Sequence, residues 1–124
     1  MKKEGIKIKM NLENNKLNRN LYFSEAVFKH LSEYINVERV LIKKLEFNKA
    51  VFERNFIIKE LYETQILIKV LEKMISRKYS GISFSKLFGK NYKWFYNILN
   101  GRNAITNDDI YLFNKFIYNK VPGM

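Results

Sequence analysis

The sequence predicts a mainly α-helical protein, with a long central helix followed by several short helices at the C-terminal end. Residues 37–78 contain neither glycine nor proline, the two poorest helix formers, and their apolar side chains recur every three or four positions. Glycines at 81, 89 and 101 then divide the rest of the chain into short segments. With 124 residues, 47% of them hydrophobic and 28% charged, the chain is long and apolar enough for one folded core.

The N-terminal residues favour a short β-strand. Residues 6–12, IKIKMNL, alternate apolar and polar side chains, which is the pattern of a strand with one apolar face. Residues 13–15 are turn-like, and residues 17–23 are expected to form the second strand of a hairpin. A basic arm without a fixed structure is the alternative for this region.

A first helix is expected over residues 25–35. Ser24 is the expected N-cap, because its hydroxyl can accept a hydrogen bond from a first-turn N–H, and Asn36 is the expected end. The expected apolar stripe comprises Val27, Phe28, Leu31 and Ile35.

The long helical pattern over residues 37–78 loses phase near Phe47-Asn48, where a break is expected. After the break it contains a heptad-like seam with alternating spacings of four and three: Ile57, Leu61, Thr64, Ile68, Leu71 and Ile75. Further apolar residues widen this face: Phe56, Tyr62, Ile66, Val70 and Met74. Such a helix must bury two sides. One side can pack on the chain's own helices, and the other either meets a twofold partner or is covered within a compact monomer.

Three short helices are expected after this point. Residues 79–81 end the long helix, and residues 82–89 form the first short helix, with Phe84, Leu87 and Phe88 facing inward. Ser85 is small enough for two helices to cross closely there, and Gly89 suits a tight turn that needs a positive φ.

The next helix is expected over residues 92–99, with Phe95, Ile98 and Leu99 facing inward and Asn100-Gly101 as a left-handed cap. Thr106 is expected to cap the last helix, whose first turn holds Asp108 and Asp109, where the helix dipole favours anions. Its buried stripe is expected to comprise Ile110, Phe113, Phe116 and Ile117.

Over about residues 66–121 these features resemble the lambda-repressor-like helix–turn–helix proteins, the XRE family. An apolar-small pair, an apolar-Gly turn, two apolar anchors, a polar-Gly-basic segment and a closing helix all match without a gap. The matching residues are Phe84-Ser85, Phe88-Gly89, Phe95, Ile98, Asn100-Gly101-Arg102, and Ile105-Thr106 through Ile117.

The chain departs from the family in three ways. Gly81 stands where the family begins its second helix with Gln, and Lys90 stands where it prefers an apolar residue. The outward face of the third helix is also bulkier, with Tyr92, Trp94 and Tyr96. Residues 1–65 lie outside the resemblance, and we expect them to supply a dimer or partner contact within one compact unit.

The resemblance implies that double-stranded DNA is the partner, with the N-terminal part of the third helix in the major groove. Asn91 and Asn97 would contact adenine edges, and Lys93 would contact guanine or phosphate. Tyr92 and Tyr96 would touch thymine methyls or phosphates. Phosphate contacts, which fix the register but read no sequence, are expected from Lys86, Lys90, Arg102 and Asn103. Phe95 is expected in the core, whereas Trp94 is left open.

The net charge of +11 is unevenly distributed. Residues 1–49 hold 11 Lys/Arg and 6 Glu, residues 50–72 hold 3 and 4, and residues 73–124 hold 9 against 2 acidic residues. The second basic region contains the helix–turn–helix pattern, and such an excess attracts polyanions. An AT-rich genome, which enriches Lys and Asn, would give the same charge without any binding role.

An enzyme is not expected. The chain has no cysteine and a single histidine, His30, which excludes thiolate zinc sites and leaves no Ser-His or Cys-His pairing in view. We expect no cofactor and no metal, and neither a signal peptide nor a membrane span is visible. A cytoplasmic location in a bacterial or phage-infected cell is therefore expected.

Two functions from different classes remain. The first is a homodimeric transcriptional regulator or repressor of phage, plasmid or bacterial type, with half-sites about 34 Å apart. The second is a phage anti-defence inhibitor, of the anti-CRISPR kind, that binds an acidic protein or a ribonucleoprotein. An exposed platform of Tyr92, Trp94 and Tyr96 would favour the inhibitor, whereas a buried Trp94 would favour operator reading. An interaction module that merely keeps the fold is a third reading.

Overall fold

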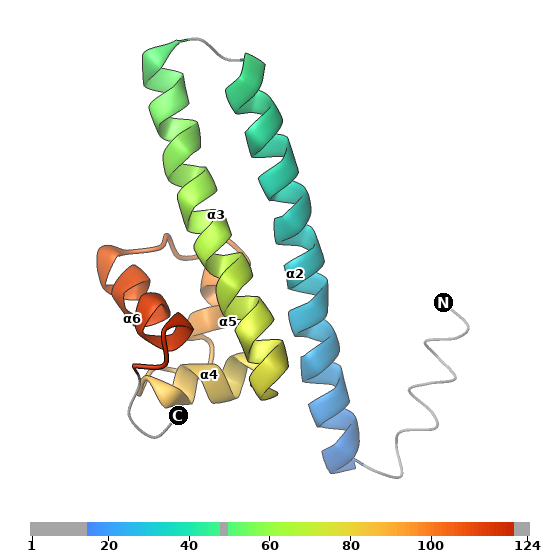
Figure 1. Cartoon of the computed structure of the whole chain (residues 1–124). Helices are drawn as coiled ribbons and strands as arrows, with labels where there is room; N and C mark the ends of the chain where they lie inside the picture. Colours follow the sequence, from blue (N-terminus) through green and yellow to red (C-terminus); the bar gives the residue numbers. More distant parts are fainter. Residues whose placement is uncertain (1–14, 48–49, 121–124) are drawn as a thin grey trace, which may run out of the picture.

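The structure, a computed structural model, describes residues 15–47 and 50–120, with side chains from residue 25 onward (Figure 1). These residues form five helices, of which α2 (Asn15–Phe47) and α3 (Val51–Arg77) make a long antiparallel hairpin. The short helices α4 (Gly81–Leu87), α5 (Trp94–Leu99) and α6 (Asn107–Ile117) gather beside the C-terminal half of α3. The predicted mainly α-helical class is confirmed, and no strand occurs within the described residues.

Helix α2 is longer at both ends than expected. It runs through Ser24 and Asn36, so the predictions that these residues cap and end a helix are wrong. Residues 17–23 are helical and do not form the second strand of a hairpin. The reason is that no glycine or proline interrupts residues 15–47, while packing on α3 from Val27 onward stabilises the helix beyond its local propensity. The strand expected over residues 6–12 lies outside the described residues.

The hairpin is closed by two facing seams. The seam predicted for α3 is confirmed, with Ile57, Thr64, Ile68 and Leu71 buried and the other two members half-buried. The seam of α2 consists of Val27, Leu31, Tyr34, Leu41 and Leu45. Phe28, expected to share this stripe, is 54% exposed. Residues that face α3 are separated by three or four positions, as Val27, Leu31 and Tyr34 are, and Phe28 directly follows one of them. The expected break falls where predicted, between Phe47 and Val51.

The main core lies where α4, α5 and α6 cover α3. Its fully buried side chains are Val27, Val70, Leu71, Met74, Phe84, Phe95, Phe113 and Phe116. Phe84 lies at the centre, with its ring centroid 4.6 Å from that of Phe95 and 4.8 Å from that of Phe116. The inward stripes predicted for the three short helices are therefore confirmed.

Helix α6 is fixed at both ends. The Thr106 hydroxyl accepts the Asp109 N–H at 3.1 Å, and the Asp109 carboxylate accepts the Thr106 N–H at 3.0 Å, so the predicted cap is confirmed as a reciprocal capping box. At the other end, Nζ of Lys73 on α3 donates to the carbonyls of Phe116 at 2.5 Å and Ile117 at 3.1 Å. This cation adds a partner to carbonyls in the last turn of the helix, where the Phe116 carbonyl also accepts the Asn119 N–H at 3.3 Å, and it ties α6 to α3.

Candidate nucleic-acid interface

Helix α4 begins immediately after α3 because of two local devices. Lys78 ends α3 in the left-handed region, with φ 60°. Ser80 then forms a capping box with Ser83: its hydroxyl accepts the Ser83 N–H at 3.1 Å, and its own N–H donates to the Ser83 hydroxyl at 2.8 Å. The corner between α3 and α4 is therefore fixed by its own sequence.

Helices α4 and α5 cross at Ser85, which is completely buried. Its hydroxyl donates to the Gly81 carbonyl at 2.8 Å and accepts the Phe95 N–H at 3.3 Å. The Phe95 N–H lies in the first turn of α5 and has no partner within that helix, so Ser85 satisfies a group that burial would otherwise penalise. The predictions for this small residue and for the positive φ at Gly89 (66°) and Gly101 (74°) are confirmed.

Trp94 is half-buried, and its ring packs against the core. Its ring stacks on that of Phe84, with centroids 6.0 Å apart and planes at 13°, and it contacts Phe113 at 5.8 Å. Its indole N–H donates to the Asp109 carboxylate at 3.3 Å. Asp109 therefore serves both the cap of α6 and the orientation of Trp94.

Tyr96 is half-buried over the start of α4. A Cβ placed on Gly81 would lie 2.5 Å from Cζ of the Tyr96 ring, closer than any real contact. The glycine that departs from the family pattern is thus matched by the bulky tyrosine that also departs from it. The expectation that Tyr96 faces outward is only partly right, because its ring fills the space that Gly81 leaves.

The remaining candidate residues form the outer surface of this region. Lys86, Lys90, Asn91, Tyr92, Lys93, Arg102 and Asn103 are all exposed, and Asn97 is half-buried. Nζ of Lys90 lies 5.8 Å from the Trp94 ring centroid, and Nζ of Lys93 lies 5.6 Å from that of Tyr92. Residues 73–107 contain seven Lys/Arg and no acidic residue, so this segment itself contributes only positive side-chain charge.

Helix α5 starts later than expected, at Trp94, because a turn precedes it. The Asn91 side-chain oxygen accepts the Lys93 N–H at 2.9 Å, which is the Asx geometry typical of such turns. At the other end, the Asn97 carbonyl accepts the N–H groups of Arg102 at 2.9 Å and Asn103 at 3.1 Å. These bonds fold residues 100–103 back onto α5, so the predicted residues on both sides of the helix belong to one continuous segment.

The sequence did not indicate that α2 borders this region. The Tyr34 hydroxyl donates to the Leu99 carbonyl at 2.9 Å, at the end of α5. Burial, and secondarily the Glu33 carboxylate, raise the pKa of Tyr34 above its ordinary value. Lys29 and His30 line an open cleft together with Tyr96 and Asn100, but Glu25 and Glu33 line it too, which makes it a poor phosphate site. No local pattern could have revealed this contact, since it joins residues 65 positions apart.

The described residues offer neither a metal-binding cluster nor a membrane-spanning helix. Within residues 15–47 and 50–120, no three His, Cys, Asp or Glu side chains are grouped closely enough to hold a metal ion. None of the helices described there combines the length and the apolar composition that crossing a bilayer requires. No protein-family model, no curated protein and no solved structure matches the chain.

Proposed function

We propose that the chain is a DNA-binding transcriptional regulator that contacts duplex DNA through α4, the turn at Gly89, and α5. The observation that supports this most strongly is the combination of a rigid α4–α5 crossing at Ser85 with an outer surface of Lys, Asn and Tyr side chains. This combination supports the helix–turn–helix arrangement that the resemblance to the XRE family implies.

In this proposal the turn before α5 and the first turn of α5 enter the major groove. Lys93 and Asn97 are the residues best placed to contact base edges, since Asn91 uses its side-chain oxygen to hold the turn. Four cations, Lys86, Lys90, Lys93 and Arg102, neutralise phosphates on either side. Four such contacts give a slope of about −3.6 for log affinity against log salt concentration per protomer.

The alternative, an anti-defence inhibitor, has less support. It requires Tyr92, Trp94 and Tyr96 to form an exposed aromatic platform. Trp94 instead packs on Phe84, and Tyr96 packs over Gly81, which leaves Tyr92 as the exposed aromatic of the three. We therefore infer operator reading as the function of this face.

Fluorescence anisotropy tests the proposal directly. A double variant, Lys93→Ala with Asn97→Ala, is compared with a matched control, Gln65→Ala with Lys69→Ala, which removes the same chemical groups from exposed positions of α3. We expect the first variant to lose at least about tenfold in affinity for an AT-rich duplex at physiological salt, since one good base contact contributes about 1–3 kcal/mol. The control should bind as the wild type does.

Two outcomes would contradict the proposal. One is duplex binding that disappears at modest salt in the wild type, which would indicate nonspecific charge attraction alone. The other is equal loss in both variants. Single-stranded DNA and RNA, measured in parallel, show whether the duplex is the preferred form. Circular dichroism verifies that the half-buried Asn97 can be replaced without unfolding.

A further inference from the structure

The end of the hairpin farthest from α4–α6 exposes large apolar side chains. Phe52 is 85% exposed, Phe47 82%, Val51 73% and Phe56 61%. Single exposed apolar residues are ordinary in soluble proteins, but neighbouring large ones such as Phe52 and Phe56, one helical turn apart, mark an interaction site.

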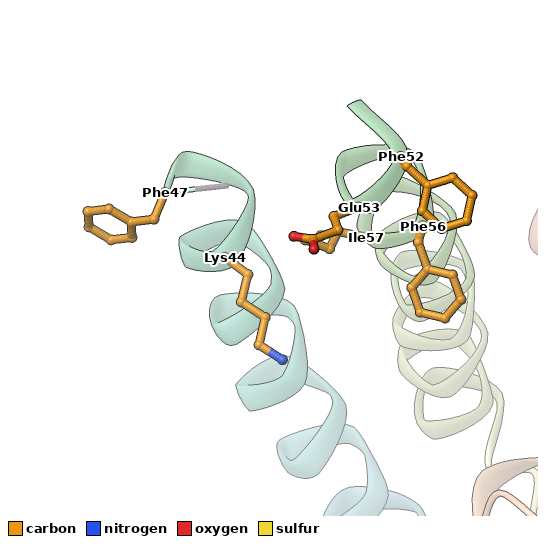
Figure 2. A pocket seen from close by; sticks show the side chains of 6 residues that line it. All are labelled: Lys44, Phe47, Phe52, Glu53, Phe56 and Ile57. Carbon is orange, nitrogen blue, oxygen red and sulfur yellow. The ribbon is translucent and has the colours of Figure 1, made fainter. Parts of the chain in front are cut away.

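Several of these residues line one groove between α2 and α3. The groove has a volume of about 700 Å³, and we call it the tip groove; it is lined by Lys44, Phe47, Phe52, Glu53, Phe56 and Ile57 (Figure 2). Figure 2 shows Phe52 and Phe56 one turn apart on the same side of α3, while Phe47 points away from α3 at the end of α2.

The same side of α3 is covered farther along the helix. Residues 52, 56, 63, 70 and 74 follow helical spacing, and so lie along one side. Val70 and Met74 on this side are completely buried by the short helices, whereas Phe52 and Phe56 have no such cover. Phe52 and Phe56 therefore lie on the side of α3 that the short helices cover farther along, with the charged Lys59 and Glu63 between the two apolar parts.

The hairpin does not need these phenylalanines to stay closed. Leu41 and Ile57 are buried between the two helices at this end. Nη1 of Arg54 donates to the Leu45 carbonyl at 2.6 Å, which joins the start of α3 to the last turn of α2. The exposed phenylalanines are thus available to a partner without serving the hairpin itself.

Phe52 and Phe56 supply more than half of the apolar area on one side of a standard protein–protein interface. With exposures of 85% and 61%, they present roughly 290 Å² of apolar surface, given about 200 Å² for each aromatic side chain. A standard interface buries about 800 Å² per partner, of which about 56–65% is apolar, or roughly 450–520 Å².

The distribution of charge favours a second copy of this chain as the partner. Residues 37–63 hold six Lys/Arg and five Glu, a net +1, so the rest of the chain carries +10 of the total +11. Two copies of so basic a protein repel each other everywhere except at a near-neutral surface. Lys44 and Glu53 also line the same groove, so its border carries both signs and can match itself about a twofold axis.

We propose that the tip groove is the interface of a twofold dimer of this chain, with Phe52 and Phe56 of each copy packed at its centre. This inference deepens the proposed function, because the reading of two half-sites requires both the DNA-binding face and the dimer. The exposed phenylalanines and the near-neutral charge define this surface whether or not the chain binds DNA.

Sedimentation equilibrium in the micromolar range tests the dimer. The wild type should sediment at about 30 kDa, twice the 14.9 kDa chain, and Phe52→Glu with Phe56→Glu should reduce it to a monomer with unchanged helical circular dichroism. The matched control, Tyr111→Glu with Tyr118→Glu, adds the same charge at two exposed aromatics of the C-terminal region and should remain dimeric. A monomeric wild type, a dimeric tip variant, or open-ended association to larger species would each overturn the proposal.

DNA binding then separates this inference from the proposed function. On a duplex with a single half-site, the tip variant should bind as the wild type does. On a duplex with two half-sites it should bind more weakly, by about 100-fold or more, because it loses the second, linked contact. A wild-type dimer that binds neither duplex would contradict the proposed function and support the interface. A wild-type monomer that binds both duplexes would contradict the interface and support the proposed function.

Discussion

Gly81 and Tyr96 offer a sharp test of the packing at the candidate interface, because the sign of one substitution depends on the other residue. In the wild type, the methyl group of Gly81→Ala would lie 2.5 Å from Cζ and 2.6 Å from Cε2 of the Tyr96 ring. The ring must therefore move away from the start of α4. In a Tyr96→Ala background the same methyl group meets no ring.

The effect of Gly81→Ala on stability should have opposite signs in the two backgrounds. Overpacking of a filled site costs about 1–3 kcal/mol, so Gly81→Ala should destabilise the wild type by an amount of this order. Without the ring, the substitution should stabilise by up to about 1 kcal/mol, the usual advantage of alanine over glycine in a helix. The two residues should therefore be coupled by about 1–4 kcal/mol.

Urea denaturation of the four proteins in this double-mutant cycle measures the coupling, with unfolding followed by circular dichroism. Ile82, the next residue, provides a control: Ile82→Ala with and without Tyr96→Ala reports any general weakening of α4. The reasoning is refuted if Gly81→Ala has the same effect in both backgrounds, since that would mean the ring does not occupy the space above Gly81.

Two further predictions concern buried polar contacts. Because burial raises the pKa of Tyr34, the unfolded chain loses the phenol proton first, so its contribution to stability is complete below pH 10 and declines as the pH rises above that value. Tyr34→Phe should reduce this decline in urea denaturation at alkaline pH, whereas Tyr118→Phe, at an exposed position, should not; equal slopes in all three proteins would contradict the assignment. Ser85→Ala should destabilise by about 1–3 kcal/mol, because it leaves the buried Phe95 N–H without its acceptor. Ser76→Ala at an exposed position of α3 should change stability little, and a loss of similar size there would show that the Ser85 contacts contribute nothing specific.

The C-terminal half could be predicted in detail because its signals are local. Gly89 and Gly101 mark turns by their own backbone freedom, and Thr106 forms a cap with a residue three positions away. Phe84, Phe95 and Phe113 each belong to a set of apolar residues at helical spacing, which identifies the inward face of each short helix without knowledge of what it packs against.

The N-terminal half was harder to predict because its structure depends on distant contacts. Ser24 and Asn36 have the chemistry of helix ends, but α3 lies alongside α2 and keeps it helical through both. Residues 17–23 satisfy a strand pattern and a helix pattern equally well over so short a length.

Packing at the candidate site was predictable only in part. The bulky Trp94 and Tyr96 were recognisable as unusual, but their partners Asp109 and Gly81 lie 15 positions away on either side. A sequence pattern gives the direction of a side chain along its own helix. It does not show which of several neighbouring elements receives it.

The central claim is that the segment from Lys86 to Asn103 contacts duplex DNA. Titration of ¹⁵N-labelled protein with an AT-rich duplex, followed by amide chemical-shift changes in two-dimensional NMR spectra, tests it most directly. We predict that the largest changes fall within residues 86–103, including Lys93 and Asn97, and that the tip groove residues around Phe52 and Phe56 change little. Changes concentrated at the tip groove, or spread evenly over every lysine-bearing surface, would contradict the claim.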